Sequence, residues 1–345
     1  MAETAGNNRR KPWMWPEDYF ANDSRRFNCE GLIDAGSFGS VWHIKEEENG
    51  VVKRQFAAKY AHLAEDTSFV ETEIRIAKKL YGALHIAQPV VVDGKMLELD
   101  SVPINALRQR RFVLMTEFLP NLTIAEFKDK AQEQRYWPVP NRILWFIFRC
   151  LVRAVIAMAN PPDRPYGQDT EAPKLETVPV REPTTDDYQV YHGDIQNENN
   201  MIFGELDIGE HRLVPMLKVI DFGWAVDDVN NMPVGKGTIT QENIYDIAQV
   251  MRSLYGHFDS SFDGDRPRAA FPNLDMDLYN LVARCSNEDP KKRPQISELL
   301  QAVQNAIRLK RRPEHFLGKP RASWESNARI AEYVREVLLS ADSQG

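Results

Sequence analysis

Cysteine is scarce in this sequence. The chain holds three: Cys29, Cys150 and Cys285. They are far apart and form no pair at metal-binding spacing, which excludes a disulfide-stapled secreted domain and favours a reducing, intracellular setting, cytoplasmic or nuclear. The chain begins without an apolar run, so we expect no signal peptide. The longest apolar stretch, 143–159, contains Arg149 and Arg153, and is therefore predicted to be a buried helix and not a membrane span.

Basic residues are also in deficit, because 43 Lys and Arg face 50 Asp and Glu, for a net charge of -7. We therefore expect no nucleic-acid partner, since binding to phosphate backbones needs clustered positive charge. The chain shows no internal repeat. Its hydrophobic share of 43% and its 345 residues suit one large globular domain or two lobes.

Two acidic motifs follow short apolar runs in the second half of the chain. The first reads His192-Gly193-Asp194-Ile-Gln-Asn-Glu-Asn199, and the second is Asp221-Phe222-Gly223 at the end of a predicted strand. A carboxylate at a strand end followed by glycine suits metal binding, because glycine allows a sharp turn. Two carboxylates and a carboxamide could hold magnesium and a hydroxyl nucleophile, which is most of what phosphoryl transfer needs.

These motifs resemble the catalytic loop H-R-D-L-x-x-x-N and the D-F-G of protein kinases, in the same order. The resemblance implies an α+β, bilobal kinase-like fold with a small β-rich N-lobe that carries one helix, and a larger, mainly helical C-lobe. The implied boundaries are an N-terminal extension at 1–26, a kinase-like domain at 27–312 (N-lobe 27–117, C-lobe 118–312), and a tail at 313–345. We expect an amphipathic helix at 323–340 in that tail.

The N-terminal part resembles the kinase glycine-rich loop and the lysine strand that follows it. Gly36 and Gly39 match the second and third glycines of G-x-G-x-x-G-x-V, whereas Asp34 replaces the first. Lys59 matches the lysine of V-A-I-K, and a lysine in an apolar strand needs a partner, because an unpaired buried ammonium is costly. We predict Glu73 as that partner. Glu71 is predicted to form a capping box with Ser68 at the start of the helix.

The resemblance also implies the roles of further residues. The implied catalytic residues are Asp194, Lys59, Glu73 and Asn199. The implied ATP-binding residues are Ile33, Gly36, Gly39, Val41, Ala57, Lys59, Thr116, Glu117, Leu119 and Met201. Asn199 and Asp221 would hold Mg²⁺, so the implied cofactors are ATP and magnesium.

The second half of the chain contains both departures from the family pattern and further matches to it. A proline-rich segment, 161–187, is predicted to be an exposed, mobile insert before the catalytic loop. The segment Cys285–Pro294 resembles the large-lobe signature C-x-x-x-D-P-x-x-R-P, but the A-P-E motif is absent, which leaves Arg293 without the glutamate that it pairs with in the family. Asp246 resembles the helix aspartate that braces the catalytic loop.

The position of Gly193 is an arginine in most regulated kinases, and this arginine receives the activating phosphate. Glycine offers no such receptor, so we expect activity without phosphorylation of the activation segment. Gln196 takes the place of a lysine that contacts the transferred phosphate in Ser/Thr kinases.

Three functions remain open from the sequence. The first is ATP- and Mg²⁺-dependent transfer to a protein hydroxyl by a serine/threonine protein kinase. The second is a small-molecule phosphotransferase of kinase-like fold, because His-Gly-Asp resembles the loop of aminoglycoside and choline kinases. The third is a pseudokinase that acts as a binding module, supported by Asp34 and Gln196. The sequence names neither the substrate nor the oligomeric state.

Overall fold

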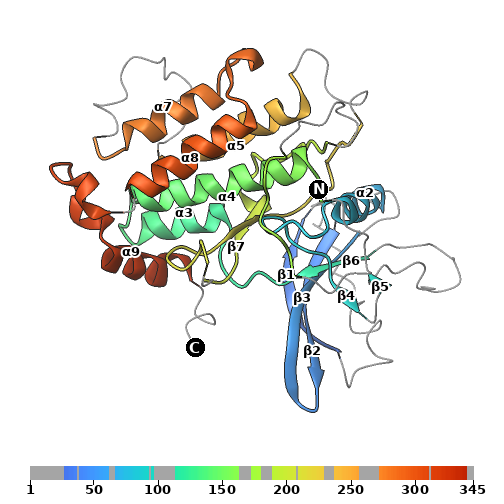
Figure 1. Cartoon of the computed structure of the whole chain (residues 1–345). Helices are drawn as coiled ribbons and strands as arrows, with labels where there is room; N and C mark the ends of the chain where they lie inside the picture. The colour runs from blue at the N-terminus through green and yellow to red at the C-terminus, as the bar shows by residue number, and fades with distance from the viewer. Residues whose placement is uncertain are drawn as a thin grey trace, which may run out of the picture. The chain divides into compact units, whose positions relative to one another are not determined.

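A computed structural model describes most of the chain (Figure 1). The described ranges are 27–36, 39–61, 67–92, 95–96, 113–162, 172–179, 189–206, 209–228, 237–255, 272–310 and 312–339. These ranges fall into two compact units, divided at Ile74/Arg75, Gln88/Pro89 and Phe118/Leu119. Unit 1 holds the described residues up to Ile74 and from Pro89 to Phe118, and unit 2 holds the rest. The predicted extension at 1–26 lies outside the described residues.

Unit 1 is built on a four-stranded antiparallel sheet in the order β1-β2-β3-β6. Its strands are β1 (Phe27–Ala35), β2 (Gly39–Glu48), β3 (Val51–Ala61) and β6 (Val113–Glu117). Asn49 and Gly50 join β2 to β3 with φ of 54° and 74°, the left-handed conformation of a tight hairpin turn. One face of the sheet packs with Val90 into an apolar core, to which the strands contribute Phe27, Ile44, Phe56, Ala58, Val113 and Met115. Two short strands, β4 (Val91–Val92) and β5 (Lys95–Met96), pair separately.

One helix, α2 (Thr67–Lys79), follows the sheet, and the chain passes from unit 1 to unit 2 within it. The predicted capping box is wrong, because the helix already begins at Thr67. Ser68 therefore lies inside the first turn, where its side chain is not in the N-cap position. Glu71 is exposed on this helix.

Unit 2 is mainly helical and is organised around α4 (Asn141–Ala159), whose residues are buried except Phe146. This confirms the prediction of a core helix: a sequence that is apolar nearly all round has no face suited to water. α3 (Ile124–Glu133), α5 (Ile239–Tyr255), α7 (Met276–Cys285) and α8 (Ile296–Lys310) complete the bundle, and α5 and α8 pack directly against α4 (Figure 1). Two short strands, β7 (Met201–Phe203) and β8 (Leu217–Val219), form an antiparallel pair. The predicted catalytic loop lies just before β7, and the predicted D-F-G lies just after β8.

The tail does not form the single helix that we predicted at 323–340. It contains two 3₁₀ turns, Pro313–Phe316 and Ala322–Glu325, then α9 (Asn327–Tyr333), and last a π turn at Val334–Leu338. Ser326 starts α9, since its hydroxyl accepts a hydrogen bond from the backbone N–H of Arg329. The tail docks on unit 2, with Ile330, Tyr333 and Val337 in the core.

The proline-rich segment is only partly as predicted. Five of the eight residues of the stretch 172–179 are exposed, but Glu176 is 7% exposed and accepts hydrogen bonds from His85. A buried carboxylate with buried partners anchors this stretch on unit 2. The remainder of the predicted insert, except for Pro161 and Pro162, lies outside the described residues.

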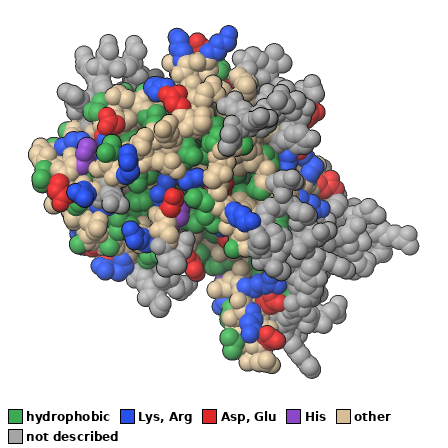
Figure 2. Space-filling model, viewed as in Figure 1, with side chains coloured by type: hydrophobic (Ala, Val, Ile, Leu, Met, Phe, Trp, Pro, Cys, Tyr) green, Lys and Arg blue, Asp and Glu red, His purple; other side chains and the backbone are tan. Residues whose placement is uncertain are grey.

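The described surface is mixed in charge. On the face shown in Figure 2, Lys and Arg side chains alternate with Asp and Glu over the described part of the chain. Among the helices that the structure describes, none has the length and apolarity needed to span a membrane.

Candidate functional site

Four of the predicted ATP-binding residues share one face of the unit 1 sheet. Val41 pairs with Lys59 across β2 and β3, and Ala57 pairs with Thr116 across β3 and β6. Directly paired residues, and residues two apart on a strand, point to the same side, so these four side chains lie together. They lie opposite the apolar core face and are partly exposed. This face combines small apolar groups with one ammonium, as a nucleotide site requires.

Lys59 pairs with Glu73, as predicted. Its Nζ lies 2.7 Å from Glu73 Oε2, and the two side chains are 19% and 8% exposed. The pair joins β3 to the first half of α2 within unit 1. Because little water reaches Glu73, the carboxylate holds the ammonium in one place and satisfies the need of a half-buried lysine for a counter-ion.

The predicted glycine-rich loop is described at both ends, whereas Ser37 and Phe38 lie outside the described residues. The Gly36 N–H donates to the carbonyl of Gly39 at 2.9 Å, and a Cβ at Gly36 would meet no atom of the described residues beyond its chain neighbours within 4 Å. The Asp34 carboxylate accepts the backbone N–H of Ala35 at 2.8 Å. Ile33 is 47% exposed.

The remaining predicted ATP-binding residues are spread over both units. Glu117 ends β6 in unit 1, where it pairs with Phe56. Leu119 and Met201 belong to unit 2, and Met201 is fully buried in its core.

In unit 2, the predicted catalytic loop is held by an asparagine that we did not predict. Asn200 is 4% exposed, and its Nδ2 lies 2.9 Å from both the backbone carbonyl and Oδ2 of Asp194. Asn199 instead accepts a hydrogen bond from the Thr123 hydroxyl at 3.4 Å. Matching by spacing selected Asn199. Asn200 follows Asn199 and directly precedes strand β7, and this position is the sequence feature that could have pointed to it.

His192 links the two acidic motifs. The Asp194 N–H donates to Nδ1 of His192 at 3.2 Å, so Nε2 carries the proton and donates to the carbonyl of Ile220 at 3.0 Å. These contacts define a neutral, fully buried imidazole. The next residue, Asp221, has a φ of 59°, a conformation that Asp tolerates better than most residues and that occurs often at functional sites.

The loop backbone is also held from α5. Asn243 accepts the N–H of His192 at 3.2 Å and donates to the carbonyl of Val190 at 2.8 Å. Asp246, the predicted brace, accepts a hydrogen bond from the Gln196 amide at 2.5 Å. Burial, together with the charge and hydrogen bond of Asp246, raises the pKa of Tyr191 beyond its ordinary range. The neutral phenol therefore stays a donor to this carboxylate.

Gly193 is required by the backbone. Its φ is +82°, and a Cβ there would lie 2.4 Å from the carbonyl oxygen of Trp224. A side chain at this position would need both a left-handed backbone and a shift of the segment after Asp221. Trp224 itself is 51% exposed.

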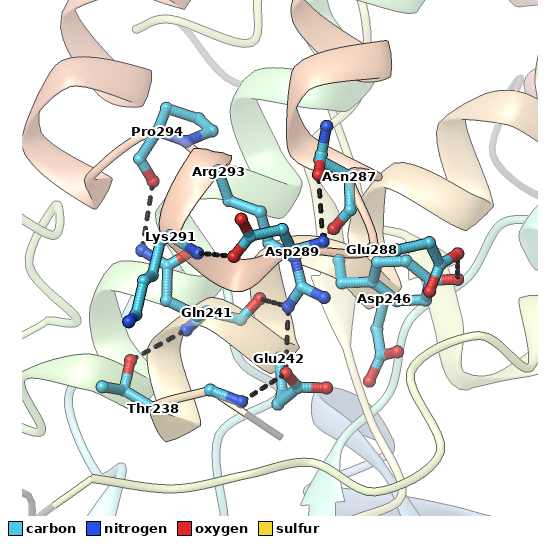
Figure 3. Close-up of polar contacts among 12 residues, drawn as sticks. Thr238, Gln241, Glu242, Asp246, Asn287, Glu288, Asp289, Lys291, Arg293 and Pro294 are labelled. Carbon is cyan, nitrogen blue, oxygen red and sulfur yellow. Dashed lines mark hydrogen bonds and ion pairs between the residues drawn. The ribbon is translucent and has the colours of Figure 1, made fainter. Parts of the chain in front are cut away.

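Arg293 finds its partner in Glu242, on the first turn of α5 (Figure 3). Arg293 Nη1 lies 2.9 Å from Glu242 Oε1 and 2.8 Å from the carbonyl of Gln241. Glu242 Oε1 also accepts the N–H of Gly237 at 3.0 Å. The sequence left this pairing open because the A-P-E motif is absent, and the glutamate comes from a helix instead.

Ion pairs also connect α2 to the segment after Asp221. Arg75 and Lys79, both in the part of α2 that belongs to unit 2, contact the carboxylate of Asp227. Burial would raise the pKa of Asp227, but the hydrogen bond and charge of Arg75, together with Lys79, lower it below its usual value. The carboxylate is therefore ionised at neutral pH.

No family model and no curated protein matches this chain. Its function is therefore inferred from its own residues.

Proposed function

We propose that this chain has a bilobal kinase-like fold and transfers the γ-phosphoryl group of ATP, with Mg²⁺, to a Ser or Thr hydroxyl of a protein. The observation that carries the proposal is the Lys59–Glu73 pair at 2.7 Å. A strand lysine held by a helix glutamate is the arrangement that places an ammonium on the α- and β-phosphates in protein kinases.

The other residues fit the same chemistry. The open backbone at Gly36 leaves room for phosphate oxygens, and the face formed by Val41, Ala57 and Thr116 suits an adenine ring. Asp221 and either Asn199 or Asn200 are oxygen donors of the kind that Mg²⁺ prefers. When bound, Mg²⁺ would neutralise charge on the phosphates.

Asp194 is the residue for the accepting hydroxyl. Its carboxylate is oriented by Asn200 at 2.9 Å and by Asn197 at 3.3 Å. In the proposed reaction the hydroxyl oxygen forms a bond to the γ-phosphorus, the bond to the ADP oxygen breaks, and the hydroxyl proton passes to Asp194.

A nucleotide-binding module without transfer is the second candidate. Gln196 stands where Ser/Thr kinases carry a lysine, and its amide is held by Asp246 at 2.5 Å. This position therefore brings no positive charge to a transferred phosphate.

One assay separates the candidates. The full chain is incubated with Mg²⁺ and labelled ATP, with generic protein substrates, with small hydroxyl acceptors or alone, and Asp194→Asn serves as the inactive control. Label on protein that is absent with Asp194→Asn supports the proposal. Transfer only to a small acceptor supports a small-molecule phosphotransferase, and nucleotide binding without transfer supports the binding module.

A further inference from the structure

A buried group of side chains of metal-binding types lies in unit 2, apart from the residues of the candidate functional site. His85, Cys150 and His211 are 0%, 2% and 1% exposed, and one ligand atom of each lies within 4.8 Å of the other two. They come from three segments: the turn after α2, the middle of α4, and the loop between β7 and β8. Only folding brings them together, which is why cysteine spacing in the sequence gave no metal signal.

The distances suit a tetrahedral ion. His85 Nε2 lies 3.3 Å from His211 Nε2. Zinc–nitrogen bonds of about 2.0–2.1 Å at tetrahedral angles place two nitrogen ligands about 3.3–3.4 Å apart. The Cys150 sulfur lies 4.0 Å from His211 Nδ1. This nitrogen is not the one that faces His85, so the sulfur must move toward the Nε2 side of the His211 ring for one ion to take all three ligands. One ligand atom of each residue already lies within 4.8 Å of the other two.

Glu176 orients the first ligand. Its Oε2 lies 2.7 Å from His85 Nδ1, and its Oε1 accepts the backbone N–H of His85 at 2.6 Å. The carboxylate thereby selects the tautomer with the proton on Nδ1, and the lone pair of Nε2 is directed at His211. A carboxylate behind a metal-binding histidine is the usual outer-shell arrangement.

The surrounding charges allow a cation. Arg153 donates to the backbone carbonyl of Glu176, and Arg149 donates to that of Glu210 at 2.9 Å. The Glu210 carboxylate lies 3.4 Å from Arg149 and 3.8 Å from Arg153, so it offsets part of their charge. A thiolate at Cys150 and the carboxylate of Glu176 then balance a divalent ion.

We propose that His85, Cys150 and His211 bind one zinc ion, with Glu176 as the acceptor that orients His85. Two imidazoles and one thiolate are ligands that zinc favours, and three protein ligands leave one position for water. Binding releases the Cys150 thiol proton to solvent. The ion fastens the 172–179 segment and the β7–β8 loop to α4. This inference stands independently of the proposed phosphoryl transfer.

The first test is the metal content of the full chain, purified without chelator and dialysed. We expect about one zinc per chain for a site of this kind. Cys150→Ser and His211→Gln should lose it. The matched controls are Cys285→Ser, another buried free thiol, and His315→Gln, an exposed imidazole, and both should keep it. Glu176→Gln should weaken zinc affinity by about 10–100-fold, as outer-shell changes do.

A second measurement uses the unaltered chain, so it does not depend on the variants folding. After chelator treatment, added Zn²⁺ should raise the melting temperature, and added Co²⁺ should give a thiolate-to-cobalt absorption band. A chain without zinc whose melting temperature does not respond to Zn²⁺ would overturn the proposal. It would identify the group as a hydrogen-bonded chain from Glu176 to Cys150. Equal zinc loss from Cys150→Ser and Cys285→Ser would overturn it as well.

Discussion

The guanidinium of Arg293 and the carboxylate of Glu242 form a buried ion pair at 2.9 Å, with each side chain 4% exposed. Glu242→Ala should strongly destabilise the chain, by about 3–5 kcal/mol, because it leaves a buried guanidinium without its counter-charge. Denaturant unfolding measures this loss. The control is Glu298→Ala, which breaks an exposed Arg284 pair at 2.8 Å and should cost at most about 1 kcal/mol. Similar losses in both variants would contradict this prediction.

The helix register of α2 predicts that Glu73 matters and Glu71 does not. Glu73→Gln should reduce phosphoryl transfer at least about tenfold, equivalent to about 1.4 kcal/mol of transition-state stabilisation, because Lys59 loses its counter-charge. Glu71→Gln changes an exposed residue two positions away and should leave the rate near that of the unaltered chain. Initial rates and melting temperatures check both variants. Equal losses of rate at unchanged melting temperature would be inconsistent with the Lys59–Glu73 pairing.

Adjacent asparagines offer a second matched pair. Asn200→Ala should remove both bonds to Asp194, cost about 1–3 kcal/mol of stability and weaken Mg²⁺-dependent activity. Asn199→Ala removes only a 3.4 Å contact with Thr123, so we expect it to change neither the stability nor the Mg²⁺-dependent activity. Rates measured across a Mg²⁺ titration, with unfolding curves, compare the two. A greater loss of magnesium dependence in Asn199→Ala would identify Asn199, the residue chosen by spacing, as the Mg²⁺ donor.

Gly193 predicts a steric effect that can be isolated. Gly193→Ala puts a Cβ 2.4 Å from the Trp224 carbonyl at a φ of +82°, whereas Gly50→Ala meets only the cost of a φ of +74° in open space. That backbone cost is about 1–2 kcal/mol. Gly193→Ala should therefore lower stability by clearly more than Gly50→Ala, as thermal unfolding would show. Equal effects would mean that Trp224 moves away at little cost.

Phosphorylation of the activation segment is expected to be unnecessary. Gly193 offers no charge to receive a phosphate there. The hydroxyl of Thr238 accepts the N–H of Gln241 at 3.3 Å, and that of Thr240 donates to Gln189 at 2.8 Å, so both already have structural roles. Phosphatase treatment should leave the initial rate unchanged within about twofold, well short of the tenfold change that 1.4 kcal/mol produces. A tenfold loss, reproduced by Thr238→Ala or Thr240→Ala, would show that another basic residue receives a phosphate.

The sequence by itself determined many elements of this protein and some of their partners. A nearly continuous apolar pattern predicted the buried helix α4, and the resemblance to the kinase motifs predicted the strands of unit 1 and selected Glu73 over Glu71 for Lys59. These features depend on neighbours along the chain, whose geometry follows from strand and helix periods. Tertiary structure alone decided which glutamate pairs with Arg293, 51 residues away, and which histidine meets His85, 126 residues away. It also decided that Glu176 is buried within a segment whose composition is that of an exposed loop. Such contacts depend on how packed elements bring distant residues together, and no local pattern encodes them.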